Sequence, residues 1–191
     1  VKIFENYDII VGRTKYEHDG KKIFGGITPR TRSAGRDIRK GRGFFFPANF
    51  RDLRDIDATL RHEFLGHHGI NTFVSADKCQ LVNALLTTRD DAEFASIWAR
   101  VDQNYADKNE LQKAEEVFAF CCEYVEPSWR VDQKEAEQAF LACTTQRKIT
   151  GIDVKAIITW VANGLQFPPF RPLQTFPKNE NEQFKQAAFY R

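Results

Sequence analysis

Hydrophobic residues recur at helical spacing through most of the chain after residue 51. Ile56, Leu60 and Phe64 follow one another every four residues, and aspartates at 52 and 55 suit the start of a helix. Later stretches with the same periodicity predict five further helices, at about 75–88, 90–103, 109–125, 132–147 and 152–163. Gly164 and the proline-rich sequence after it end this pattern, and residues 180–190 are expected to form one more short helix.

The first fifty residues show shorter patterns that are not helical. Residues 2–13 are rich in Ile, Val, Phe and Tyr, and they predict one or two short strands. Residues 28–43 are polar, basic and interrupted by glycine, so we expect a long loop there. The phenylalanine run 44–46 predicts another short strand. Pro47 would confine it to the edge or end of a sheet, because proline has no N–H to donate.

Together these patterns predict an α+β fold, in which a small N-terminal antiparallel or mixed sheet precedes a mainly helical body. A chain of 191 residues is long enough to form one domain with its own core. We place this domain at residues 1–164, with a sheet-and-loop part at 1–51 and a helical part at 52–164. Residues 165–191 are a Pro/Phe-rich C-terminal extension.

Composition narrows the class of protein. Hydrophobic residues make up 42% of the chain, with 17 Phe, which predicts a packed core rather than disorder. No apolar run approaches the ~20 residues that span a bilayer, so we expect no membrane association. The four cysteines include no CxxC pair and indicate free thiols in a reducing compartment, the cytoplasm. The chain begins with Val and contains no Met, so we expect a processed product or a piece of a longer protein.

The net charge of +2 conceals an asymmetry along the chain. Residues 1–51 carry 12 Lys/Arg and 5 Asp/Glu, whereas the remainder carries 16 and 21. The basic part could face nucleic acid, a membrane surface or an acidic partner, or it could be an ordinary solvated surface.

Three of the four histidines lie within seven residues, at His62, His67 and His68, and Glu63 follows the first. A zinc hydrolase requires two neutral imidazoles, a third ligand, an open position for water and a carboxylate near that water. His62 and His67 are five residues apart, which places them about 140° apart around an α-helix. One extra residue in the turn, as in a π-bulge, would bring them together, and Gly66 lies where that distortion is least resisted. The spacing is either coincidental or the mark of a deformed metal-binding helix, and the density of histidines favours the second.

The run HEFLGH, residues 62–67, resembles the HEXXGH signature of the dipeptidyl peptidase III family of zinc peptidases. The longer stretch 44–70 resembles the zincin-like domains of large polyvalent proteins encoded by plasmids and phages. These resemblances imply a zincin-like fold and a zinc-dependent peptidase. The second also implies an origin in a bacterial cell, with action there or in a recipient or host cell.

A third ligand is expected on a later helix. The stretch 114–120 resembles the EExxA helix of the HEXXGH peptidases, in which the second acid binds zinc. The resemblance implies that Glu116 is the third ligand and that Glu115 holds an imidazole N–H. The chain departs from that pattern at Phe120, where the peptidases carry an acid.

The predicted reaction is hydrolysis of a peptide or protein substrate by water bound to zinc. His62, His67 and Glu116 would hold the ion, and Glu63 would act as the general base. A strand formed by Phe44, Phe45 and Phe46 would pair with an extended substrate through free backbone groups. The donor to the transition-state oxyanion is left open among three candidates, His68, Tyr105 and Tyr124.

Three other functions fit parts of the same pattern. The chain could be a zinc-binding zincin scaffold without activity, a metal-dependent nuclease, or a nucleic-acid-binding module that uses the basic N-terminal part. Metal content distinguishes these functions from one another, because a peptidase or a zincin scaffold should contain about one zinc per chain. A nuclease would prefer another divalent metal, and a plain binding module would hold none.

Overall fold

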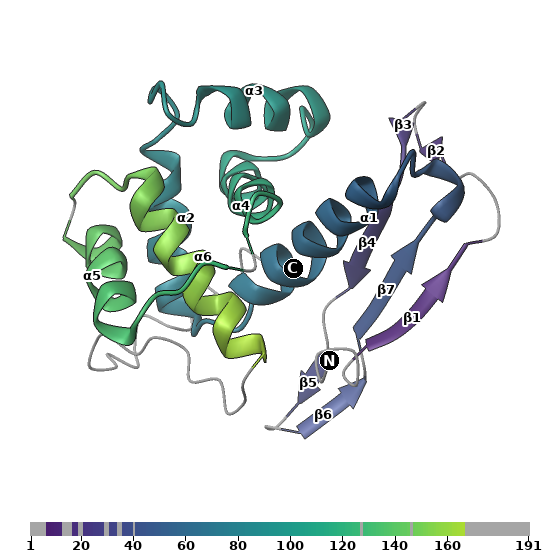
Figure 1. The fold of residues 1–191 in the computed structure, drawn as a ribbon, viewed down its shortest axis with the longest axis horizontal. Coiled ribbons are helices and arrows are strands. Elements are labelled where there is room, and N and C mark those ends of the chain that lie inside the picture. The colour runs from purple at the N-terminus through teal and green to yellow at the C-terminus, as the bar shows by residue number, and fades with distance from the viewer. Residues whose placement is uncertain are drawn as a thin grey trace.

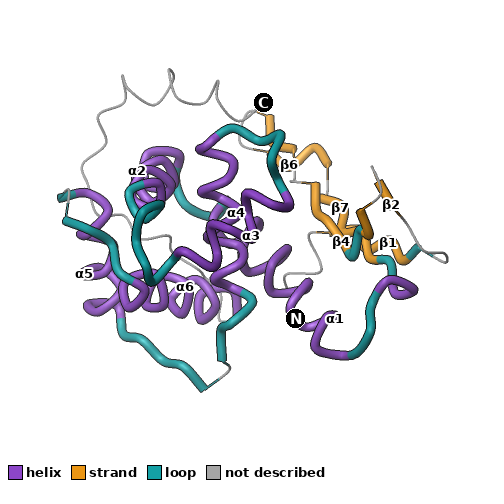
Figure 2. Tube along the Cα trace, turned by 90° about the horizontal axis from the view of Figure 1, so that it is seen from above, coloured by secondary structure: helices purple, strands orange, loops and turns teal. Residues whose placement is uncertain are grey.

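The computed structural model describes residues 7–12, 17–18, 21–28, 31–33, 36–39, 41–126, 128–145 and 147–166. The fold within these ranges is α+β, as predicted: short strands come first and a mostly helical body follows (Figure 1). Seen from above, the strands gather on one side of the molecule and the helices on the other (Figure 2). The helix predicted at 180–190 lies outside the described residues, as does nearly all of the extension after residue 164.

A small mixed sheet forms the strand side of the molecule. Its order is β1-β7-β4, with β7 parallel to β1 and antiparallel to β4. Two-stranded ribbons, β2 with β3 and β5 with β6, accompany it. The bounds are β1 Tyr7–Val11, β2 Glu17–His18, β3 Lys21–Lys22, β4 Gly25–Thr28, β5 Thr31–Ser33, β6 Arg36–Arg39 and β7 Gly41–Phe45.

Two predictions for this region are wrong. The segment 28–43 is not one long loop, because most of it pairs in β5, β6 and β7. The phenylalanine run is not at an edge either. β7 is the central strand, and Phe45 O and Phe46 N bond to residues 12 and 24 on opposite sides. Pro47 removes no bond from this ladder, since it begins the short 3₁₀ turn η2 (Pro47–Asn49) after the strand. The proposed substrate edge at Phe44, Phe45 and Phe46 therefore does not exist.

The six helices predicted between residues 52 and 163 are confirmed, although the third begins at Ala95, about five residues later than predicted. The Asp52 carboxylate accepts from the backbone N–H groups of Arg54 and Asp55, which caps the first helix as expected. The last helix continues through Gly164 to Gln166, two residues beyond the predicted stop. The bounds are α1 Leu53–Leu60, η3 Arg61–His68, α2 Ser75–Leu86, α3 Ala95–Asn104, α4 Glu110–Cys122, α5 Gln133–Thr144 and α6 Gly151–Gln166.

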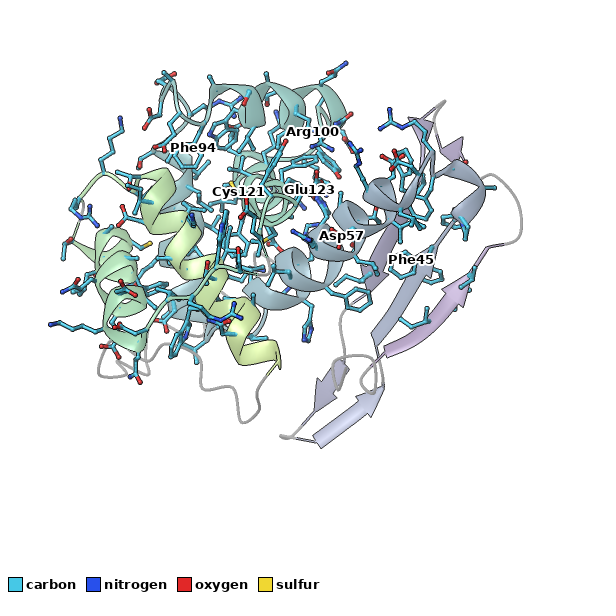
Figure 3. The ribbon with its side chains drawn as sticks, in the orientation of Figure 1. Phe45, Asp57, Phe94, Arg100, Cys121 and Glu123 are labelled. Carbon is cyan, nitrogen blue, oxygen red and sulfur yellow. The ribbon has the colours of Figure 1, made fainter. Side chains whose placement is uncertain are left out.

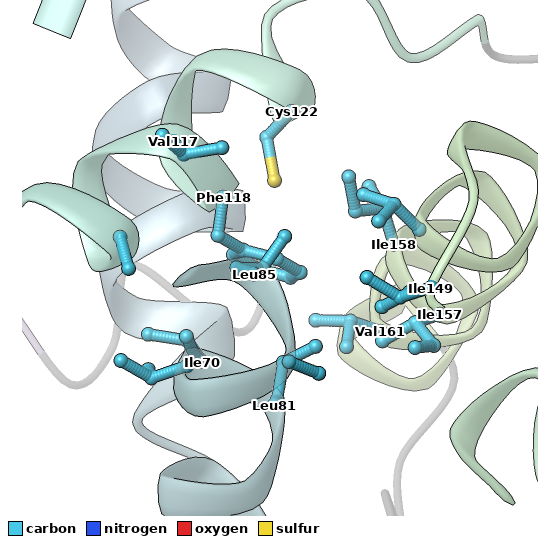
Figure 4. Packing of buried hydrophobic residues seen from close by; sticks show 14 of the residues in the cluster. Ile70, Leu81, Leu85, Val117, Phe118, Cys122, Ile149, Ile157, Ile158 and Val161 are labelled. Carbon is cyan, nitrogen blue, oxygen red and sulfur yellow. The ribbon is translucent and has the colours of Figure 1, made fainter. Parts of the chain in front are cut away.

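The main core lies among helices α2, α4, α5 and α6 (Figure 4). Its fully enclosed side chains come from several helices and from the turns beside them, so one cluster fixes their mutual positions. They include Ile70, Leu81, Leu85, Val117, Phe118, Ile149, Ile157, Ile158 and Val161. A second, smaller cluster joins the sheet to the helices through Phe45 and Phe64, whose rings stack 6.0 Å apart.

The helix that follows the sheet changes type in the middle. α1 passes directly into η3, a π-helix, so the predicted deformation is confirmed and extends over eight residues. This segment crosses α4 closely: a Cβ built on Gly66 would lie 2.7 Å from both Cα and Cβ of Ala119. Glycine at this position therefore allows the two helices to approach, which brings the side chains beside it into contact with α4.

Candidate metal centre

Three side chains from these two helices converge at one point. His62 and His67 project from η3, and Glu116 projects from α4. Nε2 of His62 lies 3.3 Å from Glu116 Oε2, and Nε2 of His67 lies 3.5 Å from the same oxygen. In a π-helix the residue five positions on sits one turn further along, and this explains how both imidazoles reach Glu116.

Two of the three separations in this group match a tetrahedral zinc ion. With zinc–ligand distances of about 2.1 Å, two ligand atoms of a tetrahedron lie about 3.4 Å apart. Each histidine–glutamate separation is close to this value, and all three atoms lie within 4.8 Å of one another. Two imidazoles with one carboxylate are a donor set that suits zinc better than magnesium or calcium.

The oxygen at the centre of the cluster accepts no hydrogen bond. Glu116 is only 3% exposed, and its buried Oε2 faces only the two imidazole nitrogens, at 3.3 and 3.5 Å. A buried acceptor left unpaired costs about 1–3 kcal/mol, and more when it is charged. A cation bound between Oε2 and the two Nε2 atoms would remove this cost.

The other nitrogen of each imidazole faces a second carboxylate. Nδ1 of His62 lies 3.0 Å from Glu123 Oε1, and Nδ1 of His67 lies 3.7 Å from Glu115 Oε1. Carboxylates in these positions favour a proton on Nδ1 and leave Nε2 free to bind metal. Glu115 faces His67 at a separation longer than a hydrogen bond, so its role in holding an imidazole N–H stays a prediction.

Glu123 was not predicted in this role. It lies seven residues after Glu116, two helical turns further along the same face, so the spacing alone could have indicated it. Arg100 holds its other oxygen at 2.8 Å, and Figure 3 shows these two side chains next to each other.

The carboxylates set the charge of the imidazoles in the metal-free protein. Burial alone would lower the pKa of each histidine, but the facing acids outweigh it. Glu116 and Glu123 raise the pKa of His62, and Glu115 and Glu116 raise that of His67 to about 10. Burial likewise opposes ionisation of Glu116, and the two imidazoles overcome it and lower its pKa.

Glu63 also lies in this centre and is 8% exposed. Burial raises the pKa of its carboxyl, while His67 and His62 and the backbone N–H of Ile27 in β4 act in the opposite direction. Glu63 is thus a buried acid close to the candidate ligands, beside the outer strand of the sheet.

The remaining side chains around the ligands are aromatic or cationic. The Phe120 ring packs against His62 at 4.8 Å, where the peptidase pattern has an acid. Lys108 Nζ lies 2.6 Å from Glu116 Oε1 and 4.6 Å from the centre of the Tyr105 ring. Burial, followed by the charge of Glu116, raises the pKa of the Tyr105 hydroxyl well above its usual value. Lys108 was not predicted, because it lies in a turn where no periodicity indicates its direction.

Three sequence candidates are not brought into the cluster. Tyr124 is 62% exposed just beyond the end of α4. His68 follows His67 but is not among the three residues that could share an ion in the described part of the chain. Phe45 packs under η3 as a core residue, so it serves structure and not binding.

The chain is similar to part of a much longer known protein. No protein-family profile matches the chain, and no solved structure does. DNA primase TraC of Escherichia coli is 35% identical over 172 residues, which cover 82% of this chain. The chain spans only 12% of the length of that relative. Among the described helices, none has the length and apolar character needed to cross a bilayer.

This similarity contradicts the predicted peptidase. The relative is named for synthesis of nucleic acid and not for hydrolysis of peptides. The assignment of Glu63 as the base of peptide hydrolysis, and the peptide substrate with it, are therefore withdrawn. The geometry of His62, His67 and Glu116 does not depend on that assignment.

Proposed function

We propose that this chain is a zinc-binding module of a DNA-primase-type protein, and that its basic N-terminal part contacts nucleic acid. The observation that carries the metal site is the convergence of two imidazole Nε2 atoms on the unpartnered Oε2 of Glu116. When bound, zinc supplies a fixed positive charge that joins η3 to α4. His62, His67 and Glu116 hold it, while Glu115 and Glu123 orient the two rings.

The charge of the centre supports a bound divalent cation. Four carboxylates lie in or beside it, and three of them pair with Lys78, Lys108 and Arg100. The fourth, Glu63, has the imidazoles as its opposing charges. With neutral imidazoles the group carries one excess negative charge, which attracts a cation. In the metal-free protein the raised pKa values of His62 and His67 supply that positive charge as protons, so a divalent ion would bind in exchange for protons.

We further propose that η3 and α4 form the metal-binding part of a zincin-like domain. The HEFLGH run on a deformed helix and the Glu115-Glu116 pair on the next crossing helix support this proposal. Peptide hydrolysis is not part of it.

The N-terminal part supplies the features that suit nucleic acid. Residues 1–51 carry 12 basic and 5 acidic residues. The β5–β6 ribbon extends beyond the end of the three-stranded sheet and away from α3 and α4 (Figure 1). Its strands include Arg32, Arg36 and Arg39, and Arg42 follows in β7. Two-stranded ribbons with basic residues are able to enter the major groove or follow the phosphate backbone.

Fluorescence anisotropy with labelled single- and double-stranded DNA at several salt concentrations tests this part of the proposal. The wild-type protein should bind, and log affinity should fall linearly with log salt. Replacing Arg32, Arg36 and Arg39 together by Ala should weaken binding and reduce the salt slope by about 0.9 for each lost phosphate contact on duplex DNA.

A matched variant controls for the loss of charge. Lys134, Lys148 and Lys155 are exposed on the helical body, so their triple replacement by Ala removes the same charge elsewhere. Equal losses in both triple variants would show that the ribbon has no special part in binding. Absence of binding by the wild-type protein to either form of DNA would refute the nucleic-acid assignment.

A further inference from the structure

The two oxygens of the Glu116 carboxylate have different surroundings. Oε2 faces the two imidazoles and has no hydrogen bond. Oε1 accepts a hydrogen bond of 2.6 Å from Lys108 Nζ, on the side away from the candidate metal position. The Glu116 side chain is 4% exposed and that of Lys108 is 34% exposed, so the lysine contacts a buried acid from the solvent side.

Lys108 is itself held firmly for a lysine in a turn. Its backbone N–H donates to Tyr105 O, and its ammonium group lies over the Tyr105 ring. The next residue, Asn109, begins α4 with a capping box made with Gln112. The base of the lysine side chain is thus fixed relative to the helix that carries Glu116.

We propose that Lys108 is a positioning residue that occupies Glu116 Oε1 and makes Glu116 a one-oxygen ligand of the metal. The inference rests on the proposed zinc site. A carboxylate with both oxygens free is able to bind an ion through both, as bidentate glutamates do with calcium. With Oε1 bound to an ammonium group, only Oε2 remains for the metal. The ion then has three protein ligands and an open fourth position.

Lys108 differs from the other cations of this centre, which only balance the charge of the acids that they contact. Lys78 pairs with Glu115 and Arg100 pairs with Glu123, so each acid in this centre has a cation beside it. Glu115 and Glu123 face Nδ1 atoms, however, whereas Glu116 faces Nε2 of both rings. Lys108 is therefore placed to change the coordination of the metal itself, which loss of a simple ion pair would not do.

Cobalt(II) bound in place of zinc reports this difference, because four-coordinate cobalt absorbs visible light more strongly than five-coordinate cobalt. The wild-type protein should give the strong four-coordinate spectrum. Lys108→Met should give a weaker, five-coordinate spectrum while retaining the metal, and Lys108→Arg should restore the strong one. Lys113→Met is the matched control, because Lys113 is on α4 but pairs with Asp102 and Glu110.

A second measurement does not depend on a variant that might fail to fold. X-ray absorption of the zinc-loaded wild-type protein should find one carboxylate oxygen bound to zinc. A second oxygen of the same carboxylate at bonding distance would overturn the inference. So would a Lys108→Met spectrum identical to that of wild type, and in both cases the metal site would stand. If the wild-type protein binds neither zinc nor cobalt, the proposed function fails and the inference fails with it.

Discussion

Replacement of Gly66 by Ala tests the helix crossing that assembles the metal centre. The new Cβ would lie 2.7 Å from Cα and Cβ of Ala119, whereas carbon atoms in good contact are about 3.5–4.0 Å apart. One of the two atoms belongs to the backbone of α4, so no side-chain rotation relieves the clash. The helices would have to separate by about 1 Å at this point.

The expected cost follows from two opposing effects. Overpacking a core costs about 1–3 kcal/mol, and we take the upper value because the obstacle is backbone. Ala is about 1 kcal/mol more favourable than Gly within a helix, which offsets part of it. The net loss is about 2 kcal/mol in the free energy of unfolding, or about 4–8 °C in Tm for a chain of this length. Zinc affinity should fall as well, because His67 follows Gly66 directly and moves away from Glu116.

Urea denaturation and thermal melts measure the stability change, and a chelator competition measures zinc affinity. Gly26→Ala is the control, because a Cβ there would meet nothing within 4 Å; this variant should be as stable as wild type or up to about 1 kcal/mol more stable. If Gly66→Ala is as stable as wild type, or more stable, the close crossing of η3 and α4 is refuted.

Three further predictions concern the surroundings of the ligands. Glu123→Gln should leave the fold intact and weaken zinc binding about 10–100-fold in a chelator competition, because it loosens His62; unchanged affinity would exclude that role. In the zinc-free protein, the raised pKa of His67 gives stabilisation that is complete below about pH 6.5 and is lost as pH rises towards 10. The Tm gained by adding zinc should therefore grow with pH over this range, and a constant gain would contradict the argument. Asn109→Ala removes the N-cap of α4 and should cost about 1 kcal/mol in urea denaturation, whereas no change would show that the cap is dispensable.

The sequence predicted the arrangement of His62 and His67 correctly because their spacing along one helix determines it. A five-residue gap between His62 and His67 cannot place both rings on one face of an α-helix, so the π-helix was the available solution. The resemblance of residues 114–120 to the EExxA helix implies that Glu115 and Glu116 lie beside the two rings, and the structure places both there.

The errors arose where pairing partners are far apart in sequence. Phe44 to Phe46 were expected at an edge because of Pro47, but β1 pairs with β7 from more than thirty residues earlier in the chain. Glycine and arginine in 28–43 favoured a loop, whereas strand pairing overrides such weak local preference. The direction of Lys108 depends on the packing of its turn against Tyr105, which no spacing rule describes.

The predicted peptidase activity was wrong for a different reason. A motif of six residues indicates a way of holding metal, and the same way of holding metal serves several functions. Similarity over 82% of the chain to a named DNA primase involves far more residues than the motif does. The metal cluster and the link to nucleic acid therefore stand as separate proposals with separate tests.

The most direct test of the metal centre is the zinc content of three purified proteins after exposure to zinc and removal of the excess. Wild type should retain about one zinc per chain, and Glu63→Gln should retain the same amount because Glu63 is not a ligand. Glu116→Ala should lose nearly all of it, since it removes the oxygen on which both imidazoles converge. No zinc in the wild-type protein, or full occupancy in Glu116→Ala, would contradict the account.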